Sequence, residues 1–149
     1  ADKWKFVAST NGSFYLQNYT SGSWETNIMA TGDAGVYINY NNATRIETTS
    51  GGCTVTGTVT ETSDVALKTN IEPLNNVLDK IHQITGYKYQ FKDTGHDSMG
   101  VTAQDVEKVF PELVHGEEGT KTLQYSGLVG ALVESVKELS NKVAALEAK

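Results

Sequence analysis

The pattern of apolar residues changes at residue 63, and this change constrains the fold more than any other feature of the chain. Residues 1–62 carry short runs in which apolar and polar residues alternate, such as residues 4–7 and 36–40, with Gly, Asn, Ser and Thr between them. Period-two runs bounded by turn-forming residues predict short β-strands. The runs are too short and too separated to close a core within one chain. We therefore expect an all-β segment whose strands share a core with other copies, as in a fibre.

From residue 63 onward the periodicity becomes helical. Four apolar residues have the spacing i, i+3, i+4 and i+7, namely Leu74, Val77, Leu78 and Ile81. This spacing predicts a short amphipathic helix that Asn70 caps, with Pro73 in its first turn. Alternating residues at 87–91 and 98–102 then predict two paired strands, with residues 93–97 as the hairpin loop.

A second short helix is predicted over residues 103–110, with Val106 and Phe110 facing inward and Pro111 ending it. Residues 111–123 are expected to be mostly loop. The predicted fold class is therefore α+β. An all-β segment over residues 1–62 precedes a small α+β domain over residues 63–149, which ends in a long helix.

The last predicted helix carries a heptad pattern. Val129, Val136 and Val143 occupy the a positions, and Tyr125, Leu132, Leu139 and Leu146 occupy the d positions. The pattern predicts a coiled coil over about residues 125–147. The alternative is an amphipathic helix packed on its own domain, but continuation to the last residues favours the coiled coil, because such a helix needs another chain to cover its stripe. Val at a with Leu at d favours two strands, so the seam alone does not decide the number of chains.

Composition and charge exclude several kinds of partner. The twelve Lys and Arg residues are scattered singly over a chain of net charge −6, which lacks the basic patch of a nucleic-acid-binding protein. No apolar run approaches the roughly 20 residues that cross a bilayer, and the N-terminus does not have the layout of a signal peptide. We therefore expect a soluble chain that binds neither nucleic acid nor membrane and that is the C-terminal piece of a longer protein.

The sequence gives no indication of a metal or another cofactor. Cys53 is the single cysteine, so it has no partner for an internal disulfide. The three histidines, His82, His96 and His115, have no ligand spacing among themselves or with Cys53. No glycine-rich phosphate loop is present either.

Ser63 and Lys68 lie at the border between the two segments and are the candidates for chemistry. A serine becomes a nucleophile when a base takes its proton, and a lysine is such a base when burial leaves its amine neutral. A Ser-Lys dyad is therefore chemically sufficient for cutting a peptide bond. The spacing alone does not distinguish this dyad from an ordinary solvated turn.

Several short motifs resemble the peptidase S74 family, the self-cleaving intramolecular chaperone domain of phage tail spikes, tail fibres and endosialidases. The motifs are Ser63-Asp64 with Lys68 and Asn70, residues 100–107 (GVTAQDVE), residues 110–114 (FPELV), and Tyr125 with Glu138-Leu139. The Thr-, Gly- and Val-rich residues 46–60 also resemble the repetitive ends of tail-fibre shafts.

The resemblance implies a homotrimeric chaperone that helps a β-structured shaft to fold and then cuts itself off. Ser63 is then the nucleophile, Lys68 the general base and Thr62–Ser63 the scissile bond, with the chain itself or a neighbouring copy as the substrate. No cofactor is implied. The chaperone step takes place in the host cytoplasm, and the mature fibre is part of the virion tail.

Four further residues of the motifs are possible supporting residues, namely Asp64, Asn70, Gln104 and Glu107. The resemblance gives them no defined role, and Asp64 either orients Lys68 or caps a turn. In the trimer the seam consists of Val129, Leu132, Val136, Leu139, Val143 and Leu146.

Two other functions are compatible with the same residues. The first is a permanent trimerisation cap, without catalysis, on a receptor-binding fibre tip. The second is the related chaperone domain of a eukaryotic membrane-bound transcription factor, which the absence of a basic region and a membrane span disfavours. Tyrosines of the β segment either stack on a host glycan or pack between chains, and the sequence favours packing.

Overall fold

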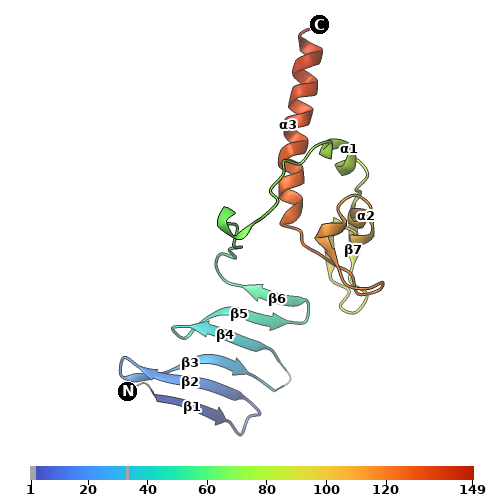
Figure 1. Cartoon of the computed structure of the whole chain (residues 1–149). Helices are drawn as coiled ribbons and strands as arrows, with labels where there is room; N and C mark the ends of the chain where they lie inside the picture. The colour runs from blue at the N-terminus through green and yellow to red at the C-terminus, as the bar shows by residue number, and fades with distance from the viewer. Residues whose placement is uncertain (1–2, 33) are drawn as a thin grey trace. The chain divides into compact units, whose positions relative to one another are not determined.

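The structure is a computed structural model that describes residues 3–32 and 34–149. It is α+β, with antiparallel sheets and a long C-terminal helix (Figure 1), as the sequence predicts. The chain divides into two compact units, Ala1–Asp64 and Val65–Lys149. The first unit is made of strands, and all the helices of the described residues lie in the second.

The first unit is a single six-stranded antiparallel sheet in which each strand pairs with the next. Its strands are β1 (Lys3–Ala8), β2 (Phe14–Thr20), β3 (Ser23–Ala30), β4 (Val36–Tyr40), β5 (Ala43–Thr49) and β6 (Gly52–Val55). Two of the connections contain two residues in the left-handed region, Ser21-Gly22 and Asn41-Asn42. Positive φ at both positions matches the twist of a tight hairpin, and Gly and Asn tolerate it best.

This sheet forms no core of its own. Among its described residues only Ser13 is buried, and large apolar side chains from every strand remain exposed. Trp4 and Phe6, for example, are 59% and 73% exposed. The sheet is therefore a single layer whose apolar side chains lack a covering partner within the unit.

The second unit starts with a 3-10 turn, η1 (Val65–Leu67), and a short helix, α1 (Val77–Ile81). A hairpin of β7 (Gly86–Gln90) and β8 (Asp97–Val101) leads into α2 (Ala103–Glu107). The remaining elements are η2 (Pro111–Leu113), β9 (Val114–His115), β10 (Thr122–Leu123) and α3 (Gly127–Glu147). The small core consists of Val77, Val106, Val109, Phe110 and Ala131, and it joins α1 and α2 to the first half of α3.

The predicted helix is present as α1, but its predicted start and its Asn70 cap are wrong. α1 begins only at Val77, and Asn76 is its N-cap. Asn70 and Asn76 both have positive φ, 52° and 56°, which interrupts a right-handed helix. Pro73 and Leu74 therefore lie outside the helix.

The segment after the hairpin also differs in detail from the prediction. α2 ends at Glu107 instead of residue 110, although Val106 and Phe110 are buried as predicted. Thr102 caps this helix, because its hydroxyl accepts a hydrogen bond of 3.2 Å from the Asp105 amide. Residues 111–123, expected to be mostly loop, contain η2 and a two-residue ladder between β9 and β10.

Tyr125, predicted to be a d residue of the last helix, instead precedes α3. Its hydroxyl donates to the Val101 carbonyl at 3.2 Å and lies over Gly100. A Cβ at Gly100 would come within 2.5 Å of that hydroxyl, so a side chain there would have to displace it. Tyr125 therefore ties the β7–β8 hairpin to the start of α3.

Candidate functional site

A row of exposed apolar side chains runs along α3. We call it the apolar stripe, and it consists of the six predicted seam residues, Val129, Leu132, Val136, Leu139, Val143 and Leu146. Each of them is between 45% and 68% exposed. A different side of the same helix is used internally, since Ala131 and Ser135 are buried. α3 thus packs on its own unit through one side and leaves the apolar stripe uncovered.

A small apolar cavity lies beside the stripe. It has a volume of about 180 Å³ and is lined by Ile81, Ile84, Val101, Leu128 and Leu132. Leu132 belongs to both the stripe and the cavity wall. Coiled-coil packing inserts side chains of one helix into holes on its neighbour, so a hole beside the stripe suits such packing.

Glu138 holds α1 against α3. Its two carboxylate oxygens each accept one hydrogen bond of 3.0 Å, from the amides of Val77 and Leu78. These amides are in the first turn of α1, where a helix has unpaired donors. The hydrogen bond from the Leu78 amide, followed in size by the one from the Val77 amide, holds the pKa of the Glu138 carboxyl below its ordinary value. The cap that the sequence assigned to Asn70 is therefore supplied from α3.

We expect Glu138→Gln to destabilise the second unit and to remove part of its acid sensitivity. A glutamine offers one acceptor and no charge to two amide donors. Because the folded pKa of Glu138 is lowered, its contribution is complete above the unfolded pKa of about 4.3 and is lost as the pH falls through the folded pKa. Thermal unfolding followed between pH 7 and pH 3 checks this.

Glu134→Gln is the matched control, because Glu134 lies one helical turn away and forms only an exposed ion pair with Lys137 at 2.7 Å. Such a pair contributes about 0–1 kcal/mol. Equal pH profiles for the two variants would contradict the assigned role of Glu138.

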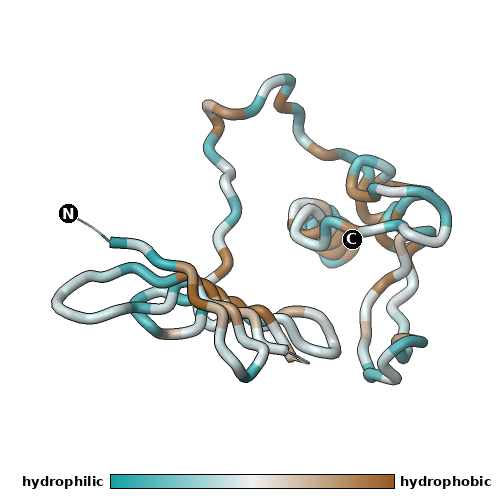
Figure 2. The backbone as a smooth tube through the Cα atoms, turned by 90° about the horizontal axis from the view of Figure 1, so that it is seen from below, coloured by the Kyte–Doolittle hydropathy of each residue, from teal (hydrophilic) through white to brown (hydrophobic). Residues whose placement is uncertain are grey.

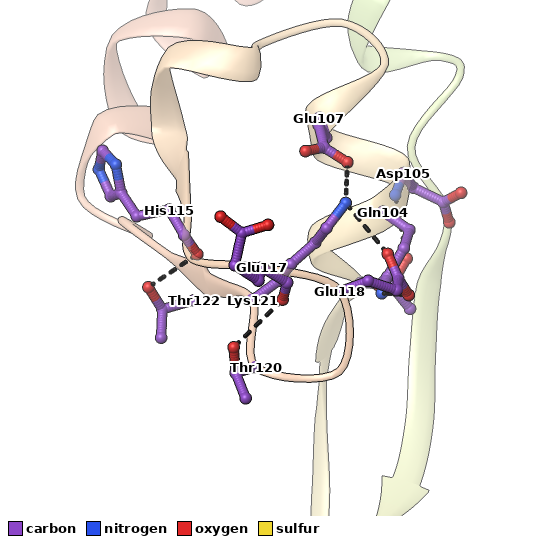
Figure 3. A network of polar contacts seen from close by, with 10 residues as sticks. Gln104, Asp105, Glu107, His115, Glu117, Glu118, Thr120, Lys121 and Thr122 are labelled. Carbon is purple, nitrogen blue, oxygen red and sulfur yellow. Dashed lines mark hydrogen bonds and ion pairs between the residues drawn. The ribbon is translucent and has the colours of Figure 1, made fainter.

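A polar network includes two of the predicted supporting residues, Gln104 and Glu107 (Figure 3). The Lys121 amine donates to the Glu107 carboxylate and lies 3.3 Å from that of Glu118, and Gln104 donates to Glu118 at 3.4 Å. The Lys121 side chain is only 14% exposed, and its hydrogen bond to Glu107 raises the pKa of the amine. Gln104 and Glu107 thus help to hold the segment between β9 and β10 on α2.

Sequence reasoning missed Lys121, the centre of this network. Its one local signal is Glu118, three residues earlier, at a common spacing for an ion pair. The contact with Glu107 joins residues 14 apart in sequence and depends on how α2 and the β9–β10 segment pack.

The predicted catalytic pair lies around η1. Ser63 and Asp64 are the last two residues of the first unit, and Lys68 belongs to the second. All three residues are exposed in the single chain. The Lys68 amide donates to the Val65 carbonyl at 3.1 Å, which closes the single 3-10 turn between the two candidates.

Within the part of the chain that the structure describes, no three His, Cys, Asp or Glu side chains gather in a way that could hold a metal ion. Cys53 is exposed there as a free thiol. None of the helices formed by these residues is long and apolar enough to cross a bilayer.

A family model matches the first part of the second segment. Residues 63–115 match the Peptidase_S74 family, described as the chaperone of endosialidase. The resemblance seen in the sequence is thereby confirmed for these residues, which are similar to the chaperone domain of the peptidase S74 class.

The individual relatives are phage tail fibre proteins. The chain is 30% identical to the long tail fiber protein Gp37 of Enterobacteria phage K3 over an alignment 159 positions long. This alignment covers 97% of this chain and 13% of the relative. It is 35% identical to Gp37 of Enterobacteria phage T2, covering 58% of this chain and 7% of the relative. For Gp37 of Salmonella phage S16 the identity is 30%, covering 74% and 16%. The chain thus spans less than a fifth of the length of these relatives.

Proposed function

We propose that residues 63–149 bring three copies of the chain together, start the folding of a tail-fibre β-segment over residues 1–62, and then release themselves by cutting between Thr62 and Ser63. The observation that carries this proposal is the apolar stripe of α3, whose residues are 45–68% exposed along the whole helix. Burial of apolar surface drives association, and a stripe with heptad spacing is buried by parallel copies of the same helix.

The order of events follows from chain entropy. A β-segment whose core is shared between chains gains no burial until the chains are aligned, so its folding begins with an entropic cost. The second unit has local contacts and its own core, so it folds before the strands align. Once α3 associates, the three β-segments are held at a high effective concentration and in phase.

The cut requires Ser63 and Lys68 to act together. The Lys68 amine removes the Ser63 hydroxyl proton, and Oγ attacks the Thr62 carbonyl carbon. The C–N bond breaks as the acyl group moves to Oγ, and the Ser63 nitrogen takes a proton as it leaves. Water then hydrolyses the ester, which gives a Thr62 carboxylate and a Ser63 with a free amine and hydroxyl. The reaction is a single turnover and needs no separate substrate pocket.

Exposure of Lys68 in the single chain supports a link between assembly and cutting. A lysine acts as a base only after it is desolvated, and neighbouring copies supply that burial in the trimer. In this proposal cleavage therefore follows association, with the scissile bond in the same chain or in a neighbouring copy. Asp64 lies between Ser63 and Lys68, and the left-handed Asn70 turns the chain two residues after Lys68.

After release the β-segment can no longer unfold through its chaperone, so the fibre becomes kinetically trapped. We place the chaperone step in the host cytoplasm and the mature fibre in the virion tail, where it meets a host surface glycan or receptor. The similarity to long tail fibre proteins supports this placement.

Intact-mass analysis of freshly expressed protein, combined with native mass spectrometry, tests the proposal. The expected result is a trimeric assembly and two fragments, one ending at Thr62 and one starting at Ser63. A trimer of full-length chains would instead identify a permanent trimerisation cap without catalysis. A monomer would refute the chaperone role.

A further inference from the structure

The N-terminal sheet carries one unbroken row of apolar side chains. Phe6 pairs with Leu16, Leu16 with Ile28, Ile28 with Ile38, Ile38 with Ile46, and Ile46 with Val55. Directly paired residues of neighbouring strands lie on the same face of a sheet. These six residues, which we call the apolar row, therefore cross all six strands on one face, with one residue from each strand.

The irregularities of the sheet leave the apolar row intact. The register shifts lie between Leu16 and Gln17 on β2 and between Ile38 and Asn39 on β4. Each register shift therefore begins just after a residue of the apolar row, so the pairing within the row is regular. Figure 2 shows the hydrophobic stretches of successive strands side by side across the sheet. Because the strands cross it, the row runs along the sheet from β1 to β6.

A second, shorter apolar row lies on the same face. It consists of Ala8, Phe14, Ala30 and Val36, each paired with the next. The rings of Phe6 and Phe14 join the two rows, with their centroids 5.7 Å apart. Neither row contains a charged residue.

The opposite face is mixed, since Val7, Tyr15, Met29 and Tyr37 pair in turn across β1 to β4 on it, beside charged residues. It carries Lys3 and Lys5 on β1 and Glu47 on β5, as their pairing with Tyr19, Gln17 and Tyr37 shows. Its aromatic rings also have polar cover, because the Lys5 amine lies 4.1 Å from the centre of the Trp24 ring. Such a cation over a ring keeps its charge in solvent while it shields the ring.

The apolar row is nevertheless uncovered in the single chain. Phe6 is 73% exposed, Ile38 45% and Val55 40%. An antiparallel sheet normally buries its apolar face and leaves the polar face to solvent. The covering layer is therefore missing from the unit.

We propose that the face carrying the apolar row packs against the same face of two further copies, with the three rows parallel to the shared axis of a three-sided shaft. This inference rests on the proposed trimer and adds the surface and the register by which its β-segments pack. A threefold axis parallel to the row brings each row residue level with its own copies. An uncharged row of similar residues is complementary to itself at every level, so a second copy of this chain is its natural partner.

Cysteine crosslinking tests which face is inside. In a Cys53→Ser background, Ile38→Cys places a thiol in the apolar row, and Tyr37→Cys places one on the neighbouring residue of β4, on the other face. Treatment of the assembled protein with a short bis-maleimide is expected to give covalent dimers of the β-segment for Ile38→Cys, up to two thirds of the chains, and mainly single chains for Tyr37→Cys.

Ile46→Cys and Glu47→Cys form a second matched pair on β5, in case the change at Ile38 prevents folding. Native mass of the same samples separates the possible failures. A trimer that crosslinks at 37 and 47, or at none of the four positions, overturns the assigned face and leaves the chaperone proposal standing. A monomer overturns both.

Discussion

Ser63→Ala is expected to leave the chain uncut while the trimer still forms. The substitution removes the oxygen that attacks the Thr62 carbonyl, so the cleavage rate should fall by roughly 10⁴-fold or more, the scale on which removal of a nucleophile slows serine peptidases. Denaturing gel electrophoresis and intact mass should then show one full-length chain. Lys68→Arg should have the same effect, since arginine keeps the charge but does not lose its proton in proteins.

Ser50→Ala is the control for this experiment, because it removes a hydroxyl from an exposed turn between β5 and β6. It should be cut like the unaltered chain. If Ser63→Ala is still cut between residues 62 and 63, Ser63 is not the nucleophile. If the uncut variant fails to assemble at all, cleavage is required for folding and does not merely lock the folded shaft.

Val136→Asp is expected to dissociate the trimer without unfolding the second unit. Val136 lies in the middle of the apolar stripe and is 66% exposed in the single chain, so the substitution costs little there. In the assembled seam it would bury a carboxylate from each of three chains at one level, and each unpaired buried charge costs several kcal/mol. At micromolar concentration, sedimentation velocity should show a monomer with an unchanged helix content by circular dichroism.

Asn141→Asp is its control, because it adds the same charge to α3 at an exposed position outside the apolar stripe. That variant should remain trimeric. A trimeric Val136→Asp would show that α3 does not carry the association, and the chaperone proposal would lose its main support.

Periodicity alone predicted the elements whose stability depends on local pattern. The period-two runs of residues 1–62 form the six strands, because turns such as Asn41-Asn42 favour tight hairpins. The heptad residues lie on one exposed stripe, because a 21-residue helix keeps its apolar spacing aligned. The partner that covers this stripe is a separate chain and stays a prediction.

The errors concern residues whose contacts lie far away in the sequence. α1 starts at Val77 and not near Asn70, because the carboxylate that binds its first amides comes from Glu138, about 60 residues later. Tyr125 fits the heptad by spacing, yet its hydroxyl binds Val101 on the hairpin. For Lys121 the one local signal is Glu118, at a spacing too common to single the lysine out. No local rule places these partners, since packing of the unit brings them together.

The bond between Glu138 and α1 also fixes the rotation of α3 about its own axis. Glu138 projects from a side of the helix away from the apolar stripe and is held there by two hydrogen bonds. The helix therefore cannot roll inward to hide its stripe on its own domain. A lone chain therefore keeps its stripe exposed, and in the proposed trimer the local concentration of sister chains sets when assembly begins.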